Sequence, residues 1–318
     1  MARWHVIVES GRQPSALRPR RRRGASMSMS YPFGHVPSAA TLARDWPRPD
    51  SRLQYSIFGP AYNMVSKAAL AIASAIFAVQ SATAAPAKNG KFIVGGEAAA
   101  EGEFPYIVAL LSNNFQFCGG TLINKDTVVT AGHCTSSDVS GYEIRAGSLL
   151  SGSGGTKVKV RSATRHPDFN NSNLDNDVAV WKLATSILES DTIKYAKLPV
   201  PGSDPAPGAN VTVAGWGRLQ EGGATPSQLQ KVTVPVVDRA TCKVAYSTPT
   251  PLEITDNMFC AGLPQGGQDA CQGDSGGPIV QGDVLIGVVS WGTGCARPNK
   301  YGVYTRLANY DSFVKKNL

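Results

Sequence analysis

Short strand-like segments with many apolar residues recur through the last two-thirds of the chain. These stretches are rich in valine, isoleucine, leucine and threonine, and clusters of Gly, Pro, Asn and Ser separate them. Short strands that recur with such turn residues between them are typical of an all-β barrel or sandwich. The clearest are Tyr106–Leu111, Thr127–Thr130, Lys157–Val160, Val178–Leu183, Val211–Ala214, Val232–Val237 and Val284–Ser290.

The end of the chain has a different rhythm. Within Tyr310–Leu318, Phe313 and Val314 can share one inward face while the lysines lie outside. This spacing predicts a short amphipathic helix. The body of the chain, residues 93–318, is long enough to bury a substantial core.

The first 92 residues differ from the body in composition. Residues 1–63 are rich in Arg, Pro and Ser and show no apolar periodicity, which predicts disorder. A short basic start at Met64 then precedes the apolar run 68–79, and Ala82-Thr83-Ala84 supplies small residues for cleavage after Ala84. The apolar run is too short for a comfortable membrane span.

A signal peptide belongs at the start of a protein. We therefore expect translation to begin at Met64, with residues 1–63 belonging to an overlong gene model. The alternative is a basic extension that directs the chain elsewhere. The sequence predicts a signal peptide over residues 64–84 and a short propeptide over residues 85–92. It therefore predicts a secreted, extracellular protein without stable membrane association.

The formal net charge of +8 is unevenly distributed. Residues 93–318 contain 18 Lys and Arg against 20 Asp and Glu, so the positive excess lies in the first 92 residues. A nucleic-acid- or membrane-binding protein, suggested by the run Arg20–Arg23, is set aside because that run lies in the segment expected to be absent from the mature protein.

All six cysteines lie in the body, at Cys118, Cys134, Cys242, Cys260, Cys271 and Cys295. Their even number predicts three disulfides and an oxidising compartment, although the spacing alone leaves 15 connectivities open. Six buried thiols in a cytosolic protein are the alternative. No CxxC occurs, and His133 beside Cys134 is poorly spaced for two ligands of one zinc ion, so neither a metal nor another cofactor is expected.

Three segments carry the residue types of nucleophilic catalysis: Thr130-Ala-Gly-His133-Cys134, Asp175-Asn-Asp177 and Gly273-Asp274-Ser275-Gly276-Gly277. A serine is a weak nucleophile until a base takes its proton, and a buried carboxylate can orient a histidine for that role. Each segment alone could be structural, the histidine beside a disulfide or the glycines in a turn. Together, in the order His, Asp, Ser, they predict a catalytic triad.

With these segments and Ile93-Val-Gly-Gly96, the body resembles a trypsin-like protease of the chymotrypsin family along its whole length, closest in character to secreted fungal trypsins. The resemblance implies two six-stranded antiparallel β-barrels, a C-terminal helix and an active site in the cleft between the barrels. It makes His133 the general base, Asp177 its orienting partner and Ser275 the nucleophile. Asp177 is preferred to Asp175 because it directly precedes an alternating strand.

The resemblance also implies how substrate is held. The backbone amides of Gly273 and Ser275 would form the oxyanion hole. Asp269 stands where trypsins place the acid at the floor of the pocket for Arg or Lys. Many trypsins have serine at the position of Ala270. The absence of that hydroxyl removes a hydrogen-bond partner for a lysine ammonium and therefore favours arginine over lysine. The other substrate-binding residues implied are Gln272, Ser290, Trp291, Gly292 and Gly302, the two glycines keeping the pocket open.

Activation follows from the same resemblance. The precursor would be a zymogen cut before Ile93, whose new α-amino group would pair with Asp274 and set the loop before Ser275. Phe92 stands where animal zymogens present Arg or Lys, so a non-tryptic activator is expected. The implied disulfides are Cys118–Cys134, Cys242–Cys260 and Cys271–Cys295.

One loop departs from the animal enzymes. The stretch from Ile144 to Pro167, where animal trypsins bind calcium, contains no Asp or Glu. Calcium requires carboxylate or other oxygen ligands, so a site of that kind is not expected here. Separately, Asn170-Asn-Ser172 and Asn210-Val-Thr212 fit the N-glycosylation pattern.

A catalytically inactive homologue acting as a binding module is the second hypothesis. Such proteins commonly lack a triad residue or the oxyanion glycine, and here all four are present. The sequence therefore predicts an active serine endopeptidase (a hydrolase) that cleaves after Arg, or less readily Lys, through an acyl-enzyme on Ser275. Its expected partners are polypeptide substrates and protein protease inhibitors, and it is expected to be a monomer.

Overall fold

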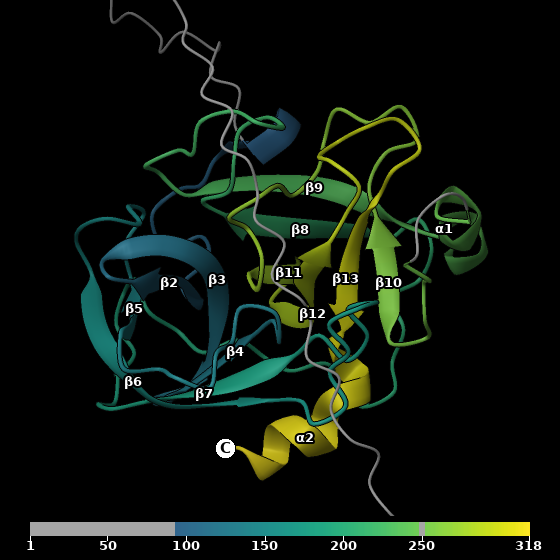
Figure 1. Ribbon diagram of the computed structural model, residues 1–318. Helices are drawn as coiled ribbons and strands as arrows, with labels where there is room; N and C mark the ends of the chain where they lie inside the picture. The colour runs from purple at the N-terminus through teal and green to yellow at the C-terminus, as the bar shows by residue number, and fades with distance from the viewer. Residues whose placement is uncertain (1–92, 248–251) are drawn as a thin grey trace, which may run out of the picture. The chain divides into compact units, whose positions relative to one another are not determined.

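The computed structural model describes residues 93–247 and 252–318 (Figure 1). The predicted extension, signal peptide and propeptide, residues 1–92, lie outside these residues. Most of the regular structure is β. Among the described residues, no helix is long and apolar enough to cross a membrane.

The first barrel is closed by six antiparallel strands in the order β2-β3-β4-β7-β6-β5. In β6 the side chains of Val158 and Val160 are buried, whereas Lys157 and Lys159 are exposed. This period of two is what a strand with one buried face requires. The strands are β2 (Ile107–Ser112), β3 (Phe115–Asn124), β4 (Thr127–Thr130), β5 (Tyr142–Ala146), β6 (Thr156–Arg165) and β7 (Ala179–Leu183).

The second barrel has the order β9-β10-β13-β12-β11-β8, and β8 pairs with β9 to close it. Val232, Val234 and Val236 of β9 are buried. The prediction of two six-stranded antiparallel barrels is therefore confirmed. The strands are β8 (Asn210–Gly215), β9 (Gln230–Val237), β10 (Met258–Ala261), β11 (Pro278–Gln281), β12 (Val284–Trp291) and β13 (Gly302–Arg306), with β1 (Glu97–Ala98) added beside β9 after the 3₁₀ turn η1 (Ile93–Gly95).

Short helices complete the fold. The α1 helix (Arg239–Ala245) begins at Asp238, whose carboxylate accepts the backbone N–H of Thr241 at 3.1 Å. The predicted C-terminal helix is confirmed as α2 (Asp311–Lys316), which follows the 3₁₀ helix η2 (Leu307–Tyr310). Val314 of α2 is buried in the core that contains the first barrel's apolar residues.

The alternation did not predict β3 as a strand, because β3 contains Gly119 and Gly120. Glycine in a strand often marks a close approach of other atoms. A Cβ on Gly120 would lie 2.7 Å from side-chain carbons of Leu110 and Val128, and one on Gly119 would lie 2.9 Å from Cα of Gly277. These two glycines let the core and the second barrel approach the strand, so packing accounts for the residues that weaken the strand pattern.

Three disulfides hold the loops of the fold. Cys118–Cys134 joins β3 to the turn after β4, Cys242–Cys260 joins α1 to β10, and Cys271–Cys295 joins two loops of the second barrel. These are the pairs that the resemblance implies. Each closes a loop of 16 to 24 residues, which restricts the unfolded chain.

The loop that lacks carboxylates contains a cation of its own. From β5, the guanidinium of Arg145 donates to the carbonyl oxygens of Ser151 at 3.1 Å and Gly152 at 3.2 Å, and also to that of Gly154. The loop carbonyls thus converge on a positive charge supplied by the chain. Arginine is suited to this task because its rigid fork offers five N–H donors.

We expect Arg145→Ala to lower the free energy of unfolding by about 1–3 kcal/mol, because three carbonyl oxygens lose charged donors. The melting temperature should fall by several degrees. Arg161→Ala, on the exposed face of β6, is the matched control and should change stability by less than about 0.5 kcal/mol. EDTA should leave the wild-type melting temperature unchanged. A drop on chelation that calcium reverses would contradict this account of the loop.

Candidate active site

The His133 ring is held by one buried carboxylate. His133 follows β4, and Asp177 lies two residues before the start of β7. The Nδ1 atom of His133 lies 2.7 Å from Oδ2 of Asp177, and the backbone N–H of His133 donates to Oδ1 at 2.8 Å. Asp177 is 1% exposed. With both carboxylate oxygens engaged, the ring is fixed so that its other nitrogen, Nε2, remains for a substrate-side partner.

Two side chains of the second barrel also donate hydrogen bonds to Asp177. The Ser290 hydroxyl donates to Oδ2 at 2.5 Å, and the Thr305 hydroxyl donates to the Asp177 carbonyl oxygen at 2.8 Å. Sequence reasoning assigned Ser290 only to the substrate strand and missed Thr305. Asp175 instead accepts from Thr255 at 2.7 Å and from Asn257, so Asp177 is the carboxylate that meets His133.

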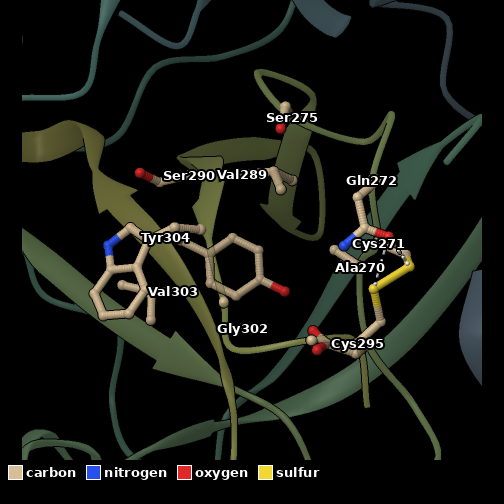
Figure 2. A pocket seen from close by; sticks show the side chains of 14 residues that line it. Ala270, Cys271, Gln272, Ser275, Val289, Ser290, Cys295, Gly302, Val303 and Tyr304 are labelled. Atoms are coloured by element: carbon tan, nitrogen blue, oxygen red, sulfur yellow. Dashed lines mark hydrogen bonds between the residues drawn. A yellow bond between two sulfur atoms is a disulfide. The ribbon is translucent and has the colours of Figure 1, made fainter. Parts of the chain in front are cut away.

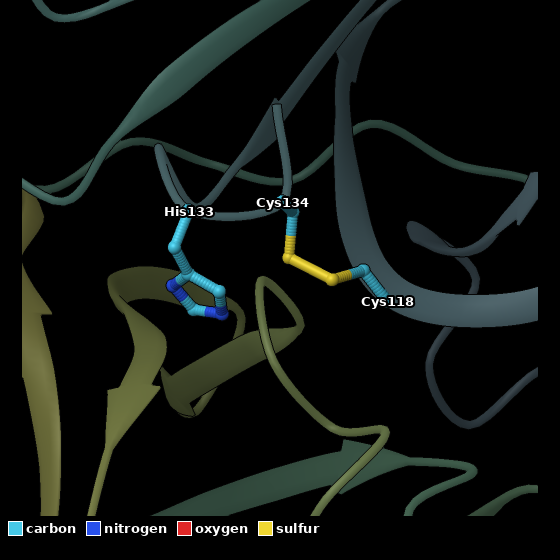
Figure 3. Close-up of side chains that lie close together, drawn as sticks. All are labelled: Cys118, His133 and Cys134. Atoms are coloured by element: carbon cyan, nitrogen blue, oxygen red, sulfur yellow. A yellow bond between two sulfur atoms is a disulfide. The ribbon is translucent and has the colours of Figure 1, made fainter. Parts of the chain in front are cut away.

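Cys118, His133 and Cys134 bring three potential ligand atoms within 4.8 Å of one another. Figure 3 shows the His133 ring beside the bond between the two sulfur atoms. Because both thiols are consumed in that disulfide, the cluster does not offer the thiolates that a zinc site needs. The disulfide instead fastens the His133 turn to β3.

The loop that carries Ser275 rests directly against the first barrel. The N–H of Gly119 in β3 donates to the Ser275 carbonyl oxygen at 2.7 Å. A Cβ on Gly276 would lie 2.2 Å from Oγ1 of Thr130, three residues before His133. The described residues show no hydrogen bond between His133 and the Ser275 hydroxyl, as is common in structures without substrate. The loops that carry these two side chains are nevertheless in contact.

The backbone N–H groups of Gly273 and Ser275 have no acceptor among the described residues. The carbonyl oxygen of Gln272, in the peptide unit before Gly273, is occupied by the N–H of Arg218 at 2.9 Å. Gly273 has φ +102°, which side chains rarely allow. Unpaired N–H groups beside a serine form a site for a developing negative charge.

Asp274 is buried beneath this loop and is 1% exposed. Its Oδ1 accepts the N–H of Gly217 at 2.7 Å, and its Oδ2 accepts that of Cys271 at 2.9 Å. Burial raises the pKa of Asp274 to about 6, and the two N–H bonds oppose that rise. Within the described ranges no cation pairs with it, so its charge is held by neutral donors alone.

The segment Ile93–Gly96 packs against the same region of the second barrel. Ile93 is fully buried, and the carbonyl oxygen of Val94 accepts the N–H of Asp269 at 3.1 Å. A Cβ on Gly95 would lie 2.1 Å from the carbonyl oxygen of Gly267. The start of the described chain is therefore an integral part of the second barrel.

A cavity of about 190 Å³ opens beside Ser275. Figure 2 shows Ser275 at one end of it and the Cys271–Cys295 disulfide along one wall. The structure brings all seven predicted substrate-binding residues to its lining: Asp269, Ala270, Gln272, Ser290, Trp291, Gly292 and Gly302. A Cβ on Gly302 would lie 2.6 Å from Oδ1 of Asp269, so glycine at this position keeps the carboxylate accessible.

Asp269 provides a buried negative group in this cavity. It is 5% exposed, and its Oδ2 accepts the N–H of Ala296 at 2.9 Å. Its Oδ1 and the nearby Tyr304 hydroxyl have no hydrogen-bond partner among the described residues. Burial raises the pKa of Asp269 to about 7. Sequence reasoning missed Tyr304, because a lone tyrosine in a buried strand carries no signal for a site.

The family model described as Trypsin matches residues 93–314. The chain is 46% identical over 228 residues to "Trypsin Blo t 3" of Blomia tropicalis, which covers 70% of this chain and 85% of that protein. It is 42% identical to "Trypsin-1" of Astacus astacus (71% and 99% covered) and 40% identical to "Serine protease 1" of Homo sapiens (76% and 95% covered). The fungal character stays a prediction.

The raised pKa of Asp269 predicts a measurable effect on stability. Between about pH 4 and 7 the folded protein holds a proton here that the unfolded chain has lost, so stability falls as pH rises through this window. Asp269→Asn removes that penalty and should raise the free energy of unfolding at pH 8 by about 1–3 kcal/mol, but not at pH 4. Exposed Asp283→Asn is the control. Equal melting temperatures of Asp269→Asn and wild type at pH 8 would contradict the assignment.

Proposed function

Because the chain belongs to the trypsin family and is a trypsin-like serine endopeptidase, we propose that it cleaves polypeptides after arginine and, less readily, after lysine. The observation that carries this specificity is the buried, unpaired Oδ1 of Asp269 in the cavity beside Ser275. A guanidinium entering the cavity would replace an uncompensated carboxylate with an ion pair. An aliphatic side chain there would leave the carboxylate unpaired, which is costly.

In this proposal Ser275, His133 and Asp177 are the catalytic triad. Oγ of Ser275 attacks the substrate carbonyl carbon while its proton passes to Nε2 of His133. The carbonyl oxygen takes negative charge and is bound by the free N–H groups of Gly273 and Ser275. The C–N bond then breaks, His133 returns the proton to the amine, and water hydrolyses the acyl-enzyme by the same steps. Asp177 stabilises the imidazolium.

Activation requires a cation for Asp274. We propose that cleavage before Ile93 frees an α-amino group that pairs with Asp274 and fixes the Gly273–Ser275 loop. Two observations support this: Ile93 is already packed in the second barrel, and Asp274 is buried with neutral donors only. Phe92 lies outside the described residues; as the residue before the bond, it favours a non-tryptic activator.

The biological setting is part of the same proposal. We infer that the protein is secreted as a zymogen, with residues 64–84 as signal peptide, residues 85–92 as propeptide and residues 93–318 as the protease domain. The three disulfides support an oxidising compartment. The enzyme would act as a monomer and could be bound by protein protease inhibitors. Asn170 and Asn210 are both exposed, as glycan acceptors must be.

The proposed function is tested on protein activated to begin at Ile93. Ser275→Ala should lower kcat/KM on an arginyl amide by at least about a thousandfold while its melting temperature stays unchanged. Asp269→Ser should lower arginyl and lysyl cleavage by about a hundredfold or more and leave a leucyl peptide no worse than wild type. Wild-type protein that prefers the leucyl peptide, or an active Ser275→Ala variant, would refute the proposal.

The ratio of arginyl to lysyl cleavage tests the pocket floor. Lysine has three donors to satisfy and reaches less far than arginine, and Ala270 offers it no hydroxyl. One missing hydrogen bond, partly replaced by water, predicts an arginine preference of about tenfold in kcat/KM on matched peptides. Ala270→Ser should raise kcat/KM on the lysyl peptide and so narrow the ratio. Ala270→Gly adds no oxygen and should not raise kcat/KM on the lysyl peptide. Equal wild-type rates would count against this pocket.

A further inference from the structure

Gln116 of β3 extends from the first barrel to the loop before Ser275. Its side-chain amide donates to the carbonyl oxygen of Gly273 at 2.8 Å and to that of Cys118 at 3.2 Å. A β-bulge sets its direction: Leu111 pairs with Gln116 and Leu110 with Cys118, so Phe117 between them has no partner. Bulges commonly re-aim a side chain next to an active site.

Three carbonyl oxygens of this loop accept hydrogen bonds from residues outside it. Gln272 receives the N–H of Arg218, Gly273 receives the Gln116 amide, and Ser275 receives the N–H of Gly119. Two of these three donors are backbone groups, which no substitution except proline removes. Gln116 alone can be altered without changing the main chain.

The peptide unit between Gly273 and Asp274 needs such a constraint. Its N–H end donates to the carbonyl oxygen of Cys271 at 3.0 Å, and its oxygen end is held by Gln116. Gly273 has φ +102° and no side chain to limit rotation. Without Gln116 the unit would be held at one end only, and its rotation would move the N–H groups on either side of it.

We propose that Gln116 is a positioning residue of the oxyanion hole: by holding the Gly273 carbonyl it keeps the N–H groups of Gly273 and Ser275 aimed at the oxygen of the tetrahedral intermediate. Gln116 itself does not touch the reacting atoms. The inference rests on the proposed function, because this oxyanion hole would act on the tetrahedral intermediate that forms at Ser275. It adds a side-chain contact from the first barrel to a feature whose N–H groups belong to the second.

A purely structural role for Gln116 makes different predictions. If the hydrogen bond between Gln116 and Gly273 merely joined the barrels, its loss would lower the stability of the protein. It would also weaken the binding of every ligand of the cleft to a similar degree. If Gln116 positions the N–H groups, its loss should weaken the binding of ligands with a tetrahedral oxyanion. The affinity for a ligand that only fills the cavity should not change. Benzamidine is a cation for the cavity without an oxyanion, whereas a peptidyl arginine aldehyde forms a hemiacetal with Ser275.

The variants are Gln116→Met, which keeps the length without a donor, and Gln116→Glu, which keeps the shape and offers only acceptors. Both should lower kcat on an arginyl p-nitroanilide by about 3- to 10-fold with KM within about twofold of wild type, since one hydrogen bond is lost. The aldehyde should bind more weakly by the same factor, and benzamidine should bind unchanged. Gln281→Met, on an exposed residue ending β11, should match wild type in every assay.

Two results would overturn the inference. One is kcat and aldehyde affinity within about 1.5-fold of wild type in both variants; the other is parallel weakening of aldehyde and benzamidine. If Gln116→Met fails to fold, Gln116→Glu carries the test alone. Failure of the proposed function is distinguishable, because it would appear as absence of arginyl turnover in the wild-type enzyme before any variant is compared.

Discussion

The junction of the two barrels depends on the burial of one carboxylate. Asp177 accepts hydrogen bonds from His133 of the first barrel and Ser290 of the second, and Thr305 holds its carbonyl oxygen. An ionised group removed from water without such partners would cost several kcal/mol. The barrels must therefore keep their relative placement for Asp177 to stay satisfied, and the orientation of the His133 ring follows from the same requirement.

Two further carboxylates are buried with fewer donors, and both have a raised pKa. Asp269 accepts the N–H of Ala296 and retains Oδ1 without a hydrogen-bond partner among the described residues, whereas Asp274 accepts N–H groups at both oxygens. Each is a negative charge without its cation. In the proposed function the missing cations come from different molecules, a substrate side chain for Asp269 and the chain's own new amino group for Asp274. Functional sites commonly keep such unfavourable groups at a cost in stability.

Local patterns in the sequence predicted the strands whose side chains alternate, such as β6 and β9, and the helix containing Val314. They did not predict β3, because Gly119 and Gly120 serve contacts with residues distant in sequence. The triad segments were found by residue type and order, and family resemblance supplied Asp269. The bonds of Ser290 and Gln116 could not be predicted, because each joins residues more than a hundred positions apart and leaves no local signature.

Arg145 gives the carboxylate-free loop an order that does not depend on the surrounding fluid. A loop built around a bound divalent ion loosens when the ion becomes scarce, or when acid protonates its carboxylate ligands. A guanidinium keeps its charge at any physiological pH and cannot diffuse away, because it is part of the chain. This loop should therefore keep the same conformation in acidic, phosphate-rich or calcium-poor surroundings. Other parts of the molecule then limit the conditions in which the enzyme stays folded.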